Sequence, residues 1–564
     1  MAETAITVRG TREPVVRYVY LVQDLSDAAR MGGVTSNVYT TSQAAYDAAV
    51  VLQTTLGGTN KVVIQVLNTA SSLTLGTVVL TANWNPNISI VGLSSANSFF
   101  GAIIGGAFTI NVSVFNITIN AGCTSTAGIT MTAVNSVINT LSTSSTTGDS
   151  GNIIINNSSN STFGSFTLDS TVGNVGNTLL NNCVGCFMGS VFMRATSAIG
   201  SFNVGTFSLG NCRTVTFTGQ VTLSITNAAS TGQIGGIIVG RTNGFIFFNQ
   251  PVNILGCTTS ARSDVQITNI SLYNCVFNNT FLVNTTGTFI SERGGWVLTT
   301  DINNCIFHHR FRMAQWPINP KVLGNDGVTP LTLTIKNTKF VSLSAGALGA
   351  AIQNNDTSFE VFNISDATAN DFLVGITIQT NPIFPPVVSF MIDGESINLS
   401  NIASNIFVSL YDVVPNSATY DVIMSNCSGF STYLESWENS NFQVNMCNYQ
   451  DAIYGYGFGL TPRTKPYYIN SSRMSQFAGN STINTGGIGV LNFIIKNSYF
   501  GYSTDVLNPW AISMSAVYNS FIESFAQATS TSSFSGTLFT STIRRLTTES
   551  VAGLTFNNSY DDPY

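Results

Sequence analysis

Charged side chains are scarce in this sequence: Asp, Glu, Lys and Arg make up 9 % of its 564 residues, against about 25 % in typical soluble domains. The net charge is −6, and no block of Lys or Arg occurs. The chain therefore lacks the electrostatic pattern of a nucleic-acid-binding protein. Ser, Thr, Asn and Gly replace the missing charge, and such a surface suits contact with water and sugars.

Long apolar runs are also missing. The mean hydropathy is +0.24, yet no run of about 18 apolar residues occurs, so we expect no membrane insertion. The first ten residues contain no hydrophobic stretch typical of a secretory signal. We therefore expect the chain to fold in a cytoplasm.

Helical periodicity is nearly absent. One segment, residues 41–52, predicts a helix, because a Thr-Ser cap precedes an Ala-rich stretch with apolar residues at helical spacing. Elsewhere, strand-length apolar runs such as 153–155 and 237–239 alternate with Gly, Asn, Ser and Thr. The sequence therefore predicts an all-β protein with a small N-terminal α/β element.

A short phrase, apolar-x-Asn-(Cys/Ser/Thr)-x-Phe, returns along the chain. It is clearest at Asn274, Asn304, Asn337 and Asn497, and looser copies include Asn182, Asn211, Asn243, Asn426 and Asn470. Counting the looser copies, the Asn residues lie roughly 20 to 35 positions apart, a period typical of a solenoid. We predict a right-handed parallel β-helix of about 16 coils, with the Asn residues as a hydrogen-bonded ladder at a turn and the Phe residues stacked inside.

The repeat divides the chain into three parts. Residues 1–60 are predicted to form an attachment and capping segment with one helix, because the open end of a solenoid must be covered. Residues 61–545 are predicted to form the β-helix, with protruding loops around 310–390 and 450–470, where Pro residues gather. Residues 546–564 are predicted to form a cap or a contact strand.

Several of the nine cysteines directly follow a ladder Asn. Side chains in register on parallel strands point the same way, which fits the torsion of a disulfide poorly. We expect buried free thiols that pack as small apolar groups.

The Ala-rich helix, the phrase Asn83-Trp-Asn-Pro-Asn-Ile-Ser-Ile-Val-Gly-Leu-Ser-Ser and the Asn-x-x-Phe coils resemble the β-helix appendage proteins of viruses, above all phage tailspikes and tail or head fibres. The resemblance is one of architecture, which pectate-lyase-like enzymes and bacterial adhesins share. It implies a virion protein assembled in the host cytoplasm and joined to other virion proteins through its N-terminal segment. Tailspike-like proteins are typically trimers, so a homotrimer is one of the assemblies to consider, and the oligomeric state stays open.

Two local carboxylate sets are the candidates for catalysis, since a glycosidase needs two acids about 5–9.5 Å apart. The first is Asp393 and Glu395, which share a face if they lie on a strand. The second is Glu435 and Glu438 around Trp437, whose ring offers a platform for a sugar. The alternative reading is that all four acids are solvated surface groups.

The other candidates point to glycan binding. His308 and Arg310 lie in the densest polar cluster, where an Arg fork suits an anionic sugar; a charged patch at a loop is the alternative. Tyr454 and Tyr456 offer aromatic contact to a glycan, or bury a loop or subunit contact. Cys183 and Cys186 have the spacing of zinc ligands but no second pair, so we expect no metal, and no cofactor motif occurs.

The sequence therefore favours a structural virion appendage that recognises host-surface polysaccharide or serves particle assembly. A polysaccharide-degrading enzyme on the same scaffold is the first alternative, and it would depend on the four acids named above. A bacterial surface adhesin or sheath subunit is the second, although it would usually carry an export signal.

Overall fold

The computed structural model describes the chain continuously over residues 76–196 and in segments elsewhere. The other described segments are 16–22, 36–57, 59–67, 201–226, 231–255, 264–283, 297–308, 311–314, 332–336, 339–340, 348–353, 358–363, 372–380, 388–393, 405–412, 420–425, 428–429, 431–436, 441–446, 448–457, 467–480, 490–502, 511–522, 533–543, 553–557 and 560–561. Two compact units are present, one with most residues up to 189 and one with most residues from 190 onward.

The elements up to residue 195 are one helix, α2 (Ser42–Leu56), and a series of short strands. These strands are β1 (Val16–Leu21), β2 (Val38–Tyr39), β3 (Lys61–Val66), β4 (Val78–Val79), β5 (Ile88–Val91), β6 (Phe99–Phe100), β7 (Ile103–Gly106), β8 (Ile110–Phe115), β9 (Thr118–Ile119), β10 (Cys123–Ser125), β11 (Gly128–Val134), β12 (Val137–Ser142), β13 (Asn152–Asn156), β14 (Thr162–Ser170), β15 (Thr178–Asn181) and β16 (Phe187–Ala195).

The strands from residue 201 to 340 follow the same pattern. They are β17 (Ser201–Gly210), β18 (Val215–Phe217), β19 (Val221–Ile225), β20 (Thr231–Val239), β21 (Ile246–Phe248), β22 (Val252–Leu255), β23 (Asp264–Tyr273), β24 (Cys275–Phe277), β25 (Phe281–Val283), β26 (Val297–Asn303), β27 (Ile306–Phe307), β28 (Phe311–Ala314), β29 (Thr332–Lys336) and β30 (Lys339–Phe340).

The remaining strands complete the second unit. They are β31 (Leu348–Gln353), β32 (Ser358–Asn363), β33 (Phe372–Thr380), β34 (Val388–Asp393), β35 (Asn405–Asp412), β36 (Tyr420–Ser425), β37 (Ser428–Gly429), β38 (Ser431–Ser436), β39 (Asn441–Asn445), β40 (Asn448–Gly457), β41 (Tyr467–Asn470), β42 (Arg473–Asn480), β43 (Val490–Lys496), β44 (Tyr499–Tyr502), β45 (Ala511–Tyr518), β46 (Phe521–Ile522), β47 (Ser533–Phe539), β48 (Thr542–Ile543), β49 (Gly553–Asn557) and β50 (Tyr560–Asp561).

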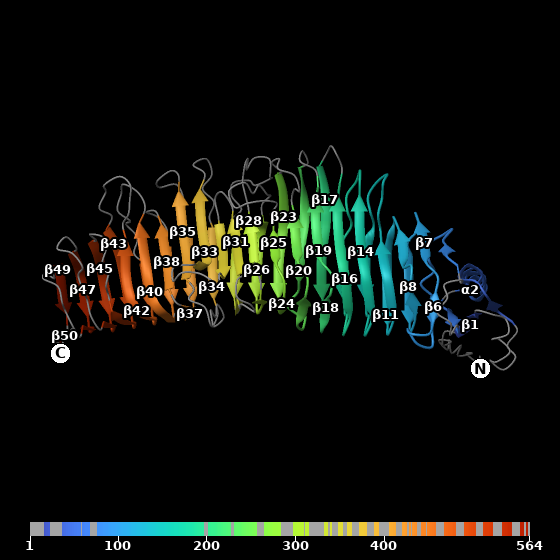
Figure 1. The fold of residues 1–564 in the computed structure, drawn as a ribbon, viewed down its shortest axis with the longest axis horizontal. Helices are drawn as coiled ribbons and strands as arrows, with labels where there is room; N and C mark the ends of the chain where they lie inside the picture. Colours follow the sequence, from blue (N-terminus) through green and yellow to red (C-terminus); the bar gives the residue numbers. More distant parts are fainter. Residues whose placement is uncertain are drawn as a thin grey trace, which may run out of the picture. The chain divides into compact units, whose positions relative to one another are not determined.

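Strands one coil apart pair in parallel, as the repeat predicted (Figure 1). In the first unit β3, β5, β8, β11 and β13 follow one another in this way. In the second unit β17, β20, β23, β26 and β29 form a first row, β18, β21, β24, β27 and β30 a second, and β19, β22, β25 and β28 a third. The fold is an all-β parallel β-helix.

One stretch of the second unit departs from parallel coils. β29 pairs directly with β34, while β31, β32 and β33, which lie between them in sequence, pair with one another in antiparallel fashion. β31 still pairs in parallel with β28 of the third row, and β33 pairs in parallel with β35. The chain thus leaves the regular coil after β31, and the first row resumes at β34. This excursion falls within the Pro-rich region where the sequence predicted protruding loops.

Helix α2 packs against β1 and β3 in the first unit. Its Thr41 cap accepts a hydrogen bond from the Ala44 amide (3.3 Å), and Tyr46 stacks on the buried Trp84 with ring centroids 4.4 Å apart. Burial raises the pKa of Tyr46 to about 12. Ser42 Oγ accepts from the Gly101 amide (3.2 Å). The helix therefore packs on core residues and binds backbone groups of the first coils.

A column of phenylalanines fills the second row of the second unit. Phe217, Phe248, Phe277 and Phe307 stack with centroids 4.7 to 4.8 Å apart and planes within 6° of parallel, and all four are at most 1 % exposed. The spacing equals the distance between neighbouring strands, so parallel register alone brings the rings face to face. The predicted internal stack is confirmed here.

Several described ladder Asn residues are followed by a buried Ser or Cys, as at Ser136, Cys183, Cys275 and Ser498, and these side chains form a second column. Each donates to the carbonyl two residues earlier, as Ser136 does to Val134 (2.8 Å) and Cys275 to Tyr273 (3.4 Å). The serines also accept from a backbone amide of the preceding coil, as Ser498 does from Ser472 (3.2 Å). Ser and Cys recur here because a small donor is needed at a buried turn.

The cysteines that the structure describes are buried thiols, as predicted: Cys123, Cys183, Cys186, Cys212, Cys275 and Cys305. Their role differs in one respect from the expectation, because five of them (all but Cys123) also donate hydrogen bonds to backbone carbonyls. Cys123 has no such contact, and burial raises its pKa to about 12.

Candidate functional site

The ladder asparagines occupy a left-handed backbone position at the turn after the first-row strand. Asn182, Asn211, Asn274, Asn304 and Asn497 all have φ between 49° and 58°, a region that Asn tolerates better than other non-glycine residues. Asn337 and Asn426 lie outside the described residues. Near the C-terminus the same backbone position is taken by Met446, Ser471 and Thr540.

The side chains of this ladder bond along the coils. Asn182 donates to Asn157 (3.0 Å), Asn304 to Asn274 (2.7 Å) and Asn497 to Asn470 (3.4 Å). Asn274 instead donates to the backbone carbonyl of Asn243 (2.6 Å). Asn243 itself is buried. Its Nδ2 donates to the carbonyls of Gly240 (2.9 Å) and Leu209 (2.8 Å), and its Oδ1 accepts from the Cys212 backbone amide (2.6 Å). At this coil the side chain therefore bonds to backbone groups of its own loop and of the preceding coil.

Of the four carboxylates proposed for catalysis, the two that the structure describes lie on different strands. Asp393 ends β34, where its register partners are Lys336 and Ser425. Glu435 lies in β38, opposite Ser409 and Tyr456. Glu395, Trp437 and Glu438 lie outside the described residues, so neither pair is tested.

The aromatic candidates lie in β40. Tyr454 pairs in register with Tyr433, and Tyr456 with Glu435, which brings two residues that the sequence analysis treated separately onto neighbouring strands. Arg310 lies outside the described residues.

His308 follows β27 and is half-buried. Its backbone amide donates to Phe277 (2.9 Å), and within the described residues its Nδ1 is buried without a hydrogen-bond partner. Burial lowers the pKa of this imidazole. Its surroundings therefore disfavour the charged form of the imidazole. A neutral imidazole attracts an anionic sugar less than a charged one, which argues against the anionic-sugar role considered for His308.

This environment predicts an acid-sensitive contribution to stability. Because the folded-state pKa is lowered, His308 contributes fully above its unfolded pKa of about 6.5, and the contribution is lost as the pH falls below that value. We expect urea midpoints of the wild type to fall from pH 7.5 to pH 5.5 by more than those of His308→Gln. Equal falls in both proteins would contradict this.

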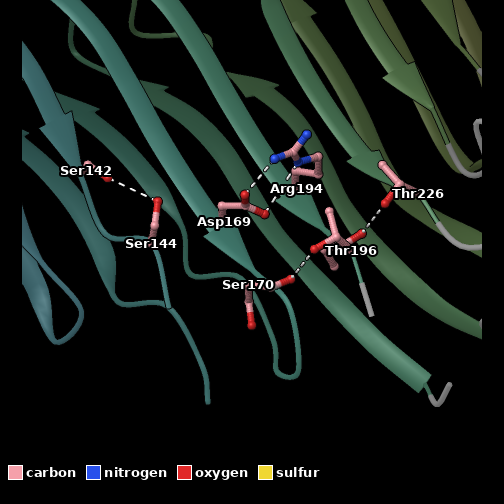
Figure 2. A network of polar contacts seen from close by, with 8 residues as sticks. Ser142, Ser144, Asp169, Ser170, Arg194, Thr196 and Thr226 are labelled. Carbon is pink, nitrogen blue, oxygen red and sulfur yellow. Dashed lines mark hydrogen bonds and ion pairs between the residues drawn. The ribbon is translucent and has the colours of Figure 1, made fainter. Parts of the chain in front are cut away.

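The described residues offer a different polar site, on the outward face of β16. Alternation along this strand turns Met193 into the core and leaves Phe192 (40 % exposed) and Arg194 outside. Arg194 binds Asp169, one coil earlier, through its Nε (3.4 Å) and Nη2 (2.7 Å) (Figure 2). This two-point contact fixes the guanidinium plane, and it raises the pKa of Arg194. The ion pair stays half open to solvent, with side-chain exposures of 51 % and 21 %.

Hydroxyl groups line the adjoining ends of these strands. Thr196 Oγ1 donates to the Ser170 carbonyl (3.3 Å) and Thr226 Oγ1 to the Ala195 carbonyl (3.2 Å) (Figure 2). In register with Phe192 are Thr222 and then Asn253 on the next strands. The outward face around Phe192 thus combines one aromatic ring, one ion pair and uncharged polar groups. We call Asp169, Phe192, Arg194 and Thr222 the outer-face site.

A second cluster joins three consecutive coils. The guanidinium of Arg241 lies 4.9 Å from the centre of the Tyr273 ring and 3.5 Å from Asp301, while the Tyr273 hydroxyl donates to the same carboxylate. Burial raises the pKa of Tyr273. The Arg241 guanidinium and the Tyr273 hydroxyl both donate to the Asp301 carboxylate, so this cluster chiefly ties the three coils together.

Within the described residues, no group of three or more His, Cys, Asp or Glu side chains is arranged to hold a metal ion. The helix that the structure describes is too short and polar to cross a membrane. No protein-family model, curated protein or solved structure matches the chain.

Sequence reasoning missed the outer-face site for a physical reason. Asp169 and Arg194 lie 25 residues apart, and only coil register brings them together. The available signal was that this separation equals one coil of the repeat, so opposite charges at that spacing on outward positions are expected to pair.

Proposed function

We propose that the protein is a structural appendage of a virus particle whose β-helix presents a glycan-binding surface, the outer-face site. The observation that carries the proposal is the exposed ring of Phe192 beside a fixed Arg–Asp pair on a stiff parallel sheet. An aromatic ring packs against the C–H face of a sugar, while Arg donates and Asp accepts hydrogen bonds from hydroxyls. Regular strands hold these groups in place, which lowers the entropy cost of binding.

The particle assignment rests on the resemblance of the coils to phage appendages. It is tested by mass spectrometry of purified particles from the source of the protein. We expect the chain among the structural proteins of the particle. Its absence from intact particles would refute the assignment while leaving the glycan-binding proposal open.

The glycan-binding proposal is tested on an array of defined oligosaccharides with the full chain. We expect at least one saccharide to bind, and Phe192→Ala and Arg194→Gln each to weaken binding about tenfold, because each removes roughly 1.4 kcal/mol of contact. Phe245→Ala serves as the matched control, since Phe245 is also exposed (48 %) but lies outside the site. Unchanged binding in the two site variants would remove this face from the proposal.

A further inference from the structure

Two cations stand at one ladder turn near the C-terminus. The first coil runs from β41 through Ser471 and Ser472 into β42, which begins with Arg473. The next runs from β43, which ends at Lys496, through Asn497 and Ser498 into β44. In register, Lys496 lies opposite Asn470, and Arg473 lies opposite Tyr499. The two cations therefore lie diagonally across one turn, in adjacent coils.

Each cation is supported by an aromatic ring of the following coil. The Arg473 guanidinium lies 5.2 Å from the centre of the Tyr499 ring, and Lys496 Nζ lies 5.4 Å from that of Tyr518. Tyr518 in turn stacks on Phe539 at 4.8 Å. A cation over a ring face is attracted by the ring quadrupole, so both side chains are held near the turn rather than free to rotate.

The turn beneath is fixed by hydrogen bonds. The side-chain Nδ2 of Asn497 donates to Asn470 Oδ1 (3.4 Å). The hydroxyl of the buried Ser498 accepts a hydrogen bond from the backbone amide of Ser472 (3.2 Å). Arg473 and Lys496 remain exposed. Among the residues that the structure describes, no carboxylate forms an ion pair with either, in contrast to Arg194 and Arg241.

We propose that this surface, defined by Arg473, Lys496 and the Asn470–Asn497 amides, binds the carboxylate or sulfate group of an acidic saccharide. The proposal rests on the proposed glycan-binding function and names the class of sugar. An anion placed over the turn accepts from a guanidinium and an ammonium at once. The preorganised cations favour such a group over a neutral hydroxyl.

The test uses the full chain and three probes of one length: hexagalacturonate, a sulfated galactan hexamer and uncharged galactohexaose. Calorimetry should show tighter binding of one or both charged probes, weakened by added NaCl because exposed charges are screened. The probe that binds more tightly identifies carboxylate or sulfate as the preferred group. Equal affinity for all three probes would overturn the proposal.

Variants locate the binding. Arg473→Gln and Lys496→Gln should each weaken binding of the charged probe about tenfold, and the double variant about a hundredfold. Arg473→Lys should retain part of the affinity, and Lys61→Gln, which removes another exposed cation on β3, should change nothing. Circular dichroism checks that every variant is folded.

Failure here is separable from failure of the proposed function. If neutral oligosaccharides bind through Phe192 and Arg194 while the double variant binds charged probes like the wild type, only the acidic-saccharide inference falls. If no saccharide of any kind binds, both fall together.

Discussion

Replacing Phe277 by Ala should lower the free energy of unfolding of its unit by about 3–5 kcal/mol. The ring is 1 % exposed and lies between Phe248 and Phe307, at 4.8 and 4.7 Å, with Phe281 edge-on at 5.2 Å. Truncation removes both stacking faces and leaves a cavity that neighbours held in parallel strands cannot fill.

Guanidinium unfolding followed by far-ultraviolet circular dichroism measures this loss. Because coils of a solenoid contact mainly their neighbours, hydrogen exchange should show the loss concentrated around residues 246–307. Phe245→Ala is the control, and as a surface change it should cost less than about 0.5 kcal/mol. If Phe277→Ala lowers the free energy of unfolding by less than about 1 kcal/mol, the stacked phenylalanines do not stabilise the fold in the way proposed.

Gly189→Ala should destabilise the first unit by roughly 2–4 kcal/mol or prevent its folding. A Cβ added to Gly189 would lie 1.4 Å from the carbonyl oxygen of Gly164, one coil earlier. Backbone, not a flexible side chain, occupies that position, so one coil must move away from the next and weaken its parallel pairing.

Gly148→Ala, in the second unit, is the control for adding a methyl group to a glycine, because a Cβ there meets nothing within 4 Å. We expect its unfolding midpoint to stay close to that of the wild type, while Gly189→Ala shifts to lower denaturant. Similar midpoints for both variants would mean that coil spacing at Gly189 adjusts freely.

The architecture was predictable because each coil of a parallel β-helix needs the same residue types at its turn and in its core, so these residues recur along the sequence once per coil. Asn274 and Asn304 mark the same left-handed turn, and the Phe three positions after each lies in the internal stack. The rule does not cover the whole column. Phe217 and Phe248 join it at other distances from Asn211 and Asn243, because the turns before them have different lengths and only the strand register is preserved.

In the C-terminal coils the sequence pattern places the ladder residue one position too early. The sequence suggested Asn470 as a ladder residue, yet the left-handed position belongs to Ser471. Asn470 nevertheless accepts the ladder hydrogen bond from Asn497. The left-handed backbone conformation and the ladder hydrogen bond therefore belong to different residues in this coil: Ser471 has the conformation, and the Asn470 side chain accepts the bond.

The sequence by itself determined the coil, the N-terminal helix and the inward Phe and Cys positions, because each depends on a pattern local to one coil or repeated at its period. Only the tertiary structure decided which outward groups meet. The contacts of Arg194 with Asp169 and of Lys496 with Tyr518 depend on the register between coils. Register is fixed by burial of the core face and by turn lengths, so a shift of one residue would leave the composition unchanged and separate every one of these pairs.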